Sequence, residues 1–227
     1  MDVLDALSRP FRRFWETDRG LSILCAIVAL MLFVLPLLHT TRPITRLLYE
    51  ISLSGLLIAG IGVLPSPRWR RFVSVAVVVV LGLRWSAWVV PSESLSHVSL
   101  AAGVASTAML AAVALVRVLR LGRVTYDHIV GAVAVYLLLG MTWAQAYGLL
   151  DGMVPGAFNQ ASPASDSPYA FVYFSVITLA TVGYGDITPV HPIARSLAML
   201  EALFGQLYLA ILLARLVSLE VAERRAK

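Results

Sequence analysis

Long apolar runs are the feature of this sequence that most limits how the chain can fold. There are six, of about 18–24 residues each, and an α-helix needs roughly 20 apolar residues to cross the hydrocarbon core of a bilayer. Backbone groups in lipid must bond within their own segment, so such runs fold as helices. The runs cover residues 21–38, 47–64, 72–90, 98–116, 129–149 and 193–216. We therefore expect an all-α membrane protein with six transmembrane helices per subunit.

The overall composition supports a membrane location. Of the 227 residues, 59% are hydrophobic and 14% are charged, whereas soluble domains average about 45–50% and about 25%. The net charge of +5 could suggest a nucleic-acid partner. The basic residues, however, stand between the apolar runs, as they do in membrane proteins. We therefore expect no nucleic-acid binding.

The distribution of basic residues predicts the orientation in the membrane. They precede the first run, separate the second from the third and the fourth from the fifth, and follow the sixth, whereas the alternate connections hold fewer. The basic residues concerned are Arg9, Arg12, Arg13, Arg19, Arg68, Arg70, Arg71, Arg117, Arg120, Arg123, Arg224, Arg225 and Lys227. Such residues favour the cytoplasmic side. This predicts a multi-pass protein of the cell membrane (inner or plasma) with both termini in the cytoplasm.

The stretch TLATVGYGDITP, residues 178–189, interrupts the apolar pattern between the fifth and sixth runs. Residues 168–180 before it are apolar but too few to cross a bilayer, which suits a re-entrant helix. Glycine is a poor helix former, and irregular backbone at membrane depth is tolerated only where it is buried in protein or lines a water-filled path. The stretch is therefore either a loop outside the membrane or a piece of backbone that serves as a ligand.

Residues 181–185 suit the second alternative. A potassium ion without its water shell needs a cage of oxygens, which successive backbone carbonyls provide if all of them point to one side. Gly183 and Gly185 allow the unusual dihedral angles this requires. Val182 and Tyr184 would point outward, and Thr181 would add a hydroxyl at the inner mouth. The predicted potassium sites are at Thr181, Val182, Gly183 and Tyr184.

The motif TVGYGD, with a short apolar helix before it and an apolar span after it, resembles the signature of the potassium channels. The resemblance covers residues 129–216, where FGQLYLAILLARL, residues 204–216, is similar to the inner helix of small bacterial ion-channel proteins. It implies passive, potassium-selective conduction by a homotetramer, because each chain supplies one filter loop and the pore needs four. The implied partners are K⁺, membrane lipid and further copies of the chain. The resemblance implies no enzyme activity and no cofactor besides K⁺ ions in the filter.

Four parts are then expected along the chain. Residues 1–20 would be a cytoplasmic amphipathic segment, or else a frayed terminus, and we do not expect a cleaved signal peptide. Residues 21–123 would form a four-helix transmembrane domain. Residues 124–219 would form the pore domain, and residues 220–227 a short cytoplasmic tail.

Several residues around the predicted filter have more than one interpretation. Thr178, Asp186 and Glu201 are candidates to support the filter. Glu201 could hydrogen-bond behind the pore helix, to Ser175 or Thr178, or it could be a charge that faces the cavity or senses protons. Gly205 could be a gating hinge or a small residue that allows close helix packing. Ala180 and Ile177 depart from the family, since many members carry threonine at the first position and some carry glutamate at the second.

Four spans before a pore also resemble the layout of voltage-gated channels, but gating charges are not evident. Residues 98–116 contain no charge, and Arg117, Arg120 and Arg123 begin where this run ends, which suggests a cytoplasmic anchor rather than a sensor. Glu50 and Arg84 lie within apolar runs, where each alone is costly, so an ion pair between them is predicted. The alternative is a single sensing charge or a ligand site. We expect weak voltage dependence, and the sequence does not identify the gating stimulus.

Two other kinds of membrane protein remain as alternatives. A potassium-uptake subunit resembles a channel but carries four degenerate filter repeats in one chain, and this chain has one complete copy. A membrane sensor or structural subunit would carry the same helices without conducting. Flux of potassium or rubidium into liposomes that hold only this protein separates a channel from such a subunit.

Overall fold

The computed structural model describes residues 19–37, 42–63, 67–89, 92–120, 126–160 and 169–225, nearly all of them helical. The amphipathic segment expected before residue 19 lies outside this part of the chain. The α-helices are α2 (Arg19–Ala29), α3 (Arg42–Val63), α4 (Pro67–Val89), α5 (Glu93–Arg120), α6 (Tyr126–Met153), α7 (Ala170–Leu179) and α8 (Pro192–Arg225). The predicted class, an all-α membrane protein, is confirmed.

Three described helices are long and apolar enough to cross a bilayer. They contain the segments Ser94–Leu119 of α5, Ile129–Met153 of α6 and Pro192–Ala222 of α8. Shorter apolar helical segments stand in the first three predicted spans and in the predicted re-entrant helix: Gly20–Val34, Leu47–Gly62, Val73–Ala87 and Ala170–Leu179. Six crossings therefore stay a prediction. The three long helices and the three shorter apolar segments before them are consistent with it.

The first apolar run is not one regular helix. It is α-helical through Ala29, changes to a π-helix over Leu30–Val34 and ends as a 3₁₀ turn over Leu35–Leu37. Pro36 explains the end of the regular pattern, because proline has no N–H to donate and its ring clashes with the carbonyl four residues earlier. A helix interrupted in this way is shorter than the run of apolar residues suggested.

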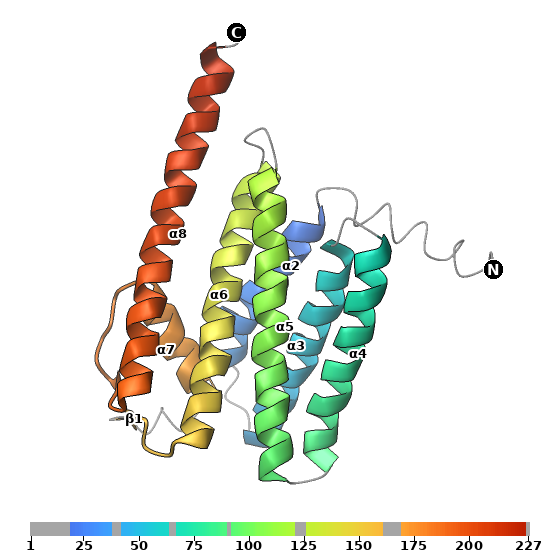
Figure 1. Ribbon diagram of the computed structural model, residues 1–227, viewed down its shortest axis with the longest axis vertical. Helices are drawn as coiled ribbons and strands as arrows, with labels where there is room; N and C mark the ends of the chain where they lie inside the picture. The colour runs from blue at the N-terminus through green and yellow to red at the C-terminus, as the bar shows by residue number, and fades with distance from the viewer. Residues whose placement is uncertain are drawn as a thin grey trace, which may run out of the picture.

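Helix α6 lies at the centre of the arrangement, with α5 along one side and α2 and α7 against its other faces (Figure 1). Half of the most apolar stretch of α6 is buried, and residues such as Ala134, Val135 and Leu138 are inaccessible to solvent. Helices α2, α3, α5 and α6 share one core cluster, which includes Leu24, Leu56 and Ala114. The part made of α2 to α5 therefore packs against the part made of α6 to α8, and the contact is made by α2 and α5 on one side and α6 on the other.

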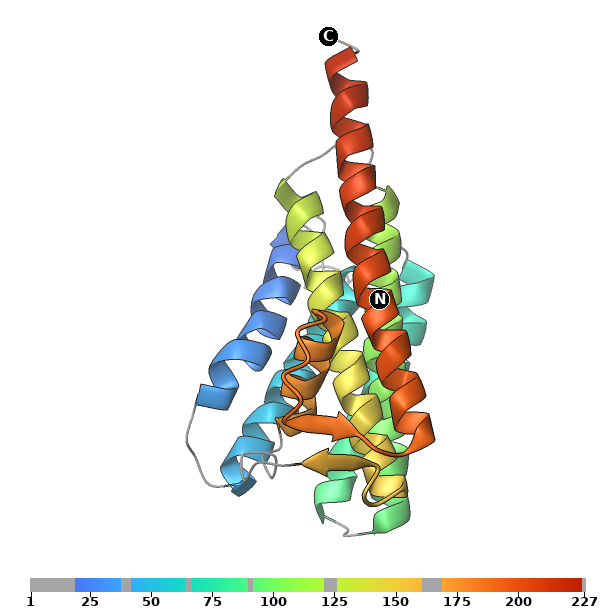
Figure 2. The ribbon, with the colours of Figure 1, turned by 90° about the vertical axis from the view of Figure 1, so that its left-hand side faces the viewer.

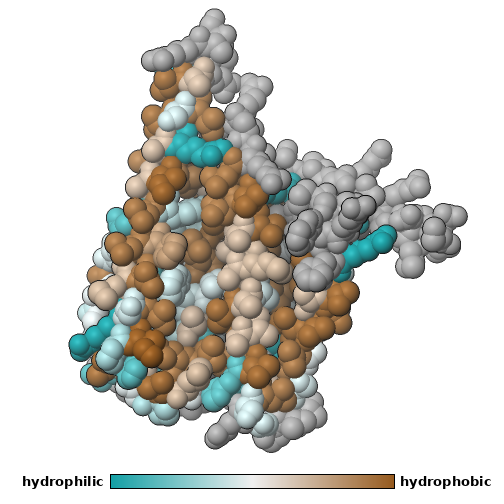
Figure 3. All heavy atoms as spheres, viewed as in Figure 1, coloured by the Kyte–Doolittle hydropathy of each residue, from teal (hydrophilic) through white to brown (hydrophobic). Residues whose placement is uncertain are grey.

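Helix α8 stands at the edge of the molecule and extends beyond the other helices (Figure 1). Only 11% of the most apolar stretch of α8 is buried, and large apolar side chains such as Leu203, Ile211 and Leu213 are exposed. The space-filling view shows apolar atoms over most of this face, with polar residues gathered mainly toward the end that holds the strands (Figure 3). A helix that is apolar on all sides needs lipid or protein around it.

A short β-ribbon closes the end of the molecule where α6, α7 and α8 meet (Figure 2). Strand β1 (Phe158–Gln160) pairs antiparallel with β2 (Ile187–Pro189), so that Phe158 faces Pro189. The ribbon lies over an aromatic cluster in which the ring centroids of Phe158 and Tyr147 are 5.5 Å apart and those of Phe174 and Tyr147 are 5.0 Å apart. This ribbon was not predicted from the sequence. Its function in the fold is to join the end of α6 to the segment that leads into α8.

Candidate functional site

The site begins where α7 ends. The N–H of Thr181 donates to the Thr178 carbonyl at 2.9 Å, and the N–H of Val182 donates to the Ile177 carbonyl at 2.8 Å. These two bonds form the Schellman motif, which satisfies the last carbonyls of a helix and needs a left-handed residue just after the C-cap. Thr181 occupies that position with φ +57°. Glycine is usual there, and a non-glycine residue costs on the order of 1–3 kcal/mol.

The backbone after α7 alternates in handedness. Thr181, Gly183 and Gly185 have φ of +57°, +54° and +83°, whereas Val182 and Tyr184 are not among the residues with positive φ. In an ordinary strand successive carbonyls point to opposite sides, but alternating left- and right-handed residues turn successive peptide groups to the same side. The sign of φ thus alternates from residue to residue over 181–185, a pattern that allows successive carbonyl groups to point to one side.

The two glycines are needed for their dihedral angles. A Cβ atom added to Gly183 or Gly185 would meet no other atom within 4 Å in the single chain. Their positive φ is nevertheless a conformation that residues with side chains rarely adopt. Val182 and Tyr184 between them are 51% and 73% exposed, so their side chains have little to pack against within one chain.

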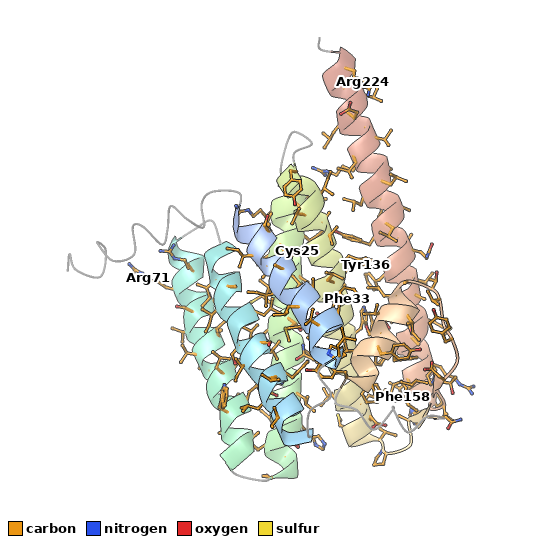
Figure 4. The ribbon with its side chains drawn as sticks, turned by 180° about the vertical axis from the view of Figure 1, so that it is seen from behind. Cys25, Phe33, Arg71, Tyr136, Phe158 and Arg224 are labelled. Carbon is orange, nitrogen blue, oxygen red and sulfur yellow. The ribbon has the colours of Figure 1, made fainter. Side chains whose placement is uncertain are left out.

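The carbonyl of Leu179, the last residue of α7, is approached from two sides. Tyr136 of α6 donates its hydroxyl proton to this oxygen at 3.2 Å. Tyr136 lies toward α8 (Figure 4), where its ring centroid is 5.9 Å from that of Tyr208. A Cβ atom on Gly205 would collide with the same Leu179 oxygen. Close packing thus requires a glycine at this position, and a hinge at Gly205 stays a prediction.

Helix α8 also contacts the side chain of Thr181. The Nε2 amide of Gln206 donates to the Thr181 hydroxyl oxygen at 3.1 Å. Gln206 is not among the site residues predicted from the sequence. The signal was available, because an amide in the middle of an otherwise apolar helix needs a polar partner.

Glu201 lies behind α7 and is completely buried. Its Oε2 accepts the hydroxyl proton of Tyr147 at 2.6 Å, and its Oε1 contacts the Ser175 hydroxyl. The contact with Ser175 corresponds to one of the two partners considered for Glu201. Tyr147 was missed, because nothing in the local sequence connects it with a residue of the last helix.

The other two candidates for filter support have different positions. Thr178 contributes its backbone carbonyl, which accepts the N–H of Thr181. Asp186 directly follows residues 181–185 and stands beside the Tyr173 side chain of α7. Thr178 therefore lies in the last turn of α7, Glu201 of α8 packs against α7 through Ser175, and Asp186 follows residues 181–185.

Glu50 and Arg84 meet inside the four-helix part. Both Glu50 oxygens accept from Arg84, Oε2 from Nε and Oε1 from Nη2, each at 2.7 Å. The third guanidinium nitrogen is 3.5 Å from the Gln145 oxygen, and the Gln145 amide donates to the Thr107 hydroxyl at 3.2 Å. All four side chains are buried. The ion pair of α3 and α4 is thus linked by hydrogen bonds to α6, which also packs against α7.

Metal-binding clusters give no further site. In the part of the chain that the structure describes, no group of three or more His, Cys, Asp or Glu side chains could hold a metal ion.

Residues 128–221 match the family model described as "Ion channel". Over 83 residues the chain is 36% identical to two pore potassium channel c of Oryza sativa subsp. japonica, which covers 37% of this chain and 17% of that protein. Over 80 residues it is 38% identical to the inward rectifier potassium channel Kirbac3.1 of Paramagnetospirillum magnetotacticum; this match covers 34% of this chain and 24% of that protein. Protein LctB of Geobacillus stearothermophilus is 44% identical over 61 residues, 27% and 42% of the two chains.

These matches cover only part of each protein. The chain spans about a sixth to a quarter of the length of the two potassium channels named first. No solved structure matches it. The family model and the two potassium channels named first describe ion channels and no enzyme, which agrees with the expectation that the chain is not an enzyme. Over residues 128–221, this membrane protein is similar to ion channels and, among them, to potassium channels.

Proposed function

We propose that the protein is a potassium-selective channel that conducts K⁺ passively through a homotetrameric pore. The observation that carries the proposal is the backbone of residues 181–185, which alternates in handedness at the end of a short apolar helix. Rings of carbonyl oxygens from four such segments replace the hydration shell of K⁺. In this proposal Thr181, Val182, Gly183 and Tyr184 provide the ion sites, and the Thr181 hydroxyl adds oxygens at the inner mouth.

The exposure of the single chain supports assembly into a tetramer. The side chains of Val182 and Tyr184 are 51% and 73% exposed. Of the most apolar stretch of α8, only 11% is buried. In a fourfold ring, neighbouring copies would cover the filter side chains and part of α8. One filter segment per chain requires four chains around the axis.

The distribution of basic residues supports a placement in the cell membrane with both termini in the cytoplasm. The connection between α6 and α8 then lies on the extracytoplasmic side, and α7 enters the membrane from that side with its carbonyl end, the negative end of its dipole, toward the membrane interior. A negative dipole end stabilises a cation at that depth. This orientation agrees with the role proposed for the segment that follows α7.

Flux through liposomes that contain only this protein tests the proposal. We expect uptake of K⁺ or Rb⁺ that greatly exceeds uptake of Na⁺, with a reversal potential close to that of K⁺ in mixed salts. A protein that assembles and inserts but carries no flux would be a non-conducting subunit. A reversal potential near the nonselective value would contradict the filter.

Replacement of glycines gives a matched test of the filter residues. Gly183→Ala should abolish selectivity or conduction, because alanine disfavours a φ of +54°. Gly156 is the control: it has φ +82°, and a Cβ atom there would also meet no atom within 4 Å. Gly156→Ala brings a comparable backbone strain outside residues 181–185 and should leave the ratio of K⁺ to Na⁺ flux unchanged. Equal loss of selectivity in both variants would show that strain alone is responsible.

A further inference from the structure

The hydrogen bonds around Glu201 determine where the protons lie. Ser175 has one hydroxyl proton, and its oxygen has two close neighbours, the Gly140 carbonyl at 2.7 Å and Oε1 of Glu201. A carbonyl oxygen accepts and cannot donate. The Ser175 proton must therefore lie toward Gly140, because two acceptors at this distance without a proton between them repel each other.

The contact between Ser175 and Glu201 then needs a proton of its own. Among the described groups that contact Ser175, the carboxyl of Glu201 can supply it, with the proton on Oε1. The other oxygen, Oε2, accepts from the Tyr147 hydroxyl at 2.6 Å. The two hydrogen bonds then form a chain. Oε1–H of Glu201 donates to the Ser175 oxygen, and the Ser175 hydroxyl donates to the Gly140 carbonyl.

Among the residues that the structure describes, no positively charged side chain contacts Glu201 to favour a carboxylate. Its side chain is fully buried, and the polar groups that contact it are the two hydroxyls. The titratable groups that face it are Tyr147 and Tyr136, both from α6, and α7 contributes the non-titratable Ser175. On α8 the nearest charged side chain is Arg195, six residues earlier, which donates to the Pro189 carbonyl. A buried carboxylate without a cation is strongly disfavoured.

We infer that Glu201 is a proton-binding site inside the fold, held as a neutral carboxylic acid that fastens α8 to α6 and α7. Loss of this proton leaves a buried anion whose Oε1 faces the Ser175 oxygen. The repulsion separates α8 from α7, the helix whose end positions residues 181–185. Alkaline pH therefore reduces ion flux; this consequence rests on the proposed channel function, whereas the protonation itself does not.

Infrared difference spectroscopy of the purified protein tests the protonation directly. At neutral pH we expect a carbonyl stretching band of a protonated carboxyl that is absent in Glu201→Gln. Glu220→Gln is the matched control: Glu220 is also on α8 but is half-exposed and paired with Arg224 at 2.9 Å, so this change should leave the band in place. A band unchanged in Glu201→Gln, or carboxylate bands at neutral pH that this variant loses, overturns the proposal.

A second variant covers the possibility that Glu201→Gln does not assemble. Tyr147→Phe removes the hydroxyl that donates to Oε2, so the same band should shift to higher frequency as its carbonyl loses a hydrogen bond. No shift would contradict the assigned donor direction.

The flux measurement is normalised within each protein, as the ratio of flux at about pH 10 to flux at about pH 7. In the natural chain we expect the flux at about pH 10 to be about tenfold lower than the flux at about pH 7, which corresponds to about 1.4 kcal/mol. In Glu201→Gln we expect the ratio to stay near one. Equal falls in both proteins would overturn the effect on flux. An acid band without any flux in either protein would instead count against the channel function and support the protonation.

Discussion

Thr181 combines a left-handed backbone with a side-chain hydroxyl that is hydrogen-bonded to α8. Its left-handed backbone, φ +57°, would suit glycine better. Glycine, however, has no hydroxyl, and the Thr181 oxygen accepts from Gln206 while keeping a second lone pair for other contacts. The strained conformation thus occurs where the side chain has a specific use, as is common at functional sites.

Gly205 allows a prediction about packing. Gly205→Ala should lower the thermal stability of the assembled protein, by about 1–3 kcal/mol, because the new methyl group meets the Leu179 carbonyl. Gly82→Ala in α4 is the control, since a Cβ there meets nothing within 4 Å, and this change should be neutral or stabilising by up to about 1 kcal/mol. Thermal unfolding in detergent measures both. Unchanged stability in Gly205→Ala together with altered channel opening would instead support a hinge.

At the scale of helices, the contacts of α6 connect the two parts of the molecule. Through Gln145 it meets the Glu50–Arg84 pair, and through Gly140 and Tyr147 it meets the groups around Glu201. Gly103 of α5 makes room for the first contact, because a Cβ there would collide with both Arg84 and Gln145. Both buried polar clusters therefore have a member on α6.

The Glu50–Arg84 pair can be tested by a double-mutant cycle. Arg84→Met alone should destabilise the protein by about 3–5 kcal/mol, because it leaves a buried carboxylate without its partner. The double change with Glu50→Leu should recover part of this loss, since apolar residues can replace a buried ion pair. Unfolding by detergent denaturation gives the four free energies. Additive effects of the two single changes would show that the pair is not coupled.

At the scale of the whole molecule, the main open surface is that of α8 and residues 181–185. We expect native mass spectrometry of the purified protein to show four copies, because four filter segments complete a pore and cover the exposed Val182 and Tyr184. The measurement should use detergent conditions in which flux is retained after reconstitution. A monomer or dimer under those conditions would contradict the proposed assembly.

Charge counting leads to a prediction about voltage. A steep sensor moves about 3–4 charges per subunit, each worth about 2.3 kcal/mol per 100 mV. Residues 98–116 carry none, and Arg84 is paired with Glu50. We therefore expect a shallow conductance–voltage curve from recordings in planar bilayers, changed little by replacement of Arg117. A steep curve that flattens on replacing Arg117 would show that α5 lies deeper in the membrane than its apolar run indicates.

Some features could be predicted from the sequence because they depend on neighbouring residues. The membrane class follows from the length of the apolar runs, and the end of α7 follows from the glycines and the short apolar stretch before them. Hydrophobicity, helix length and backbone freedom are local properties. The regularity of a helix within a run is less evident: inside the first predicted span, residues 21–38, the helix changes from α to π at Leu30 and ends as a 3₁₀ turn at Leu37, near Pro36.

Only the tertiary structure decided the partners of the polar residues. Tyr147 lies 54 residues before Glu201, and Gln206 lies 25 residues after Thr181. The β-ribbon joins strands of three residues each, too short to leave a pattern of alternation. Periodicity shows which face of a helix is apolar but not which residue of a distant helix stands opposite, because that depends on how the helices cross. The protonation inferred for Glu201 depends on three such crossings, and for that reason no stretch of the sequence alone contained it.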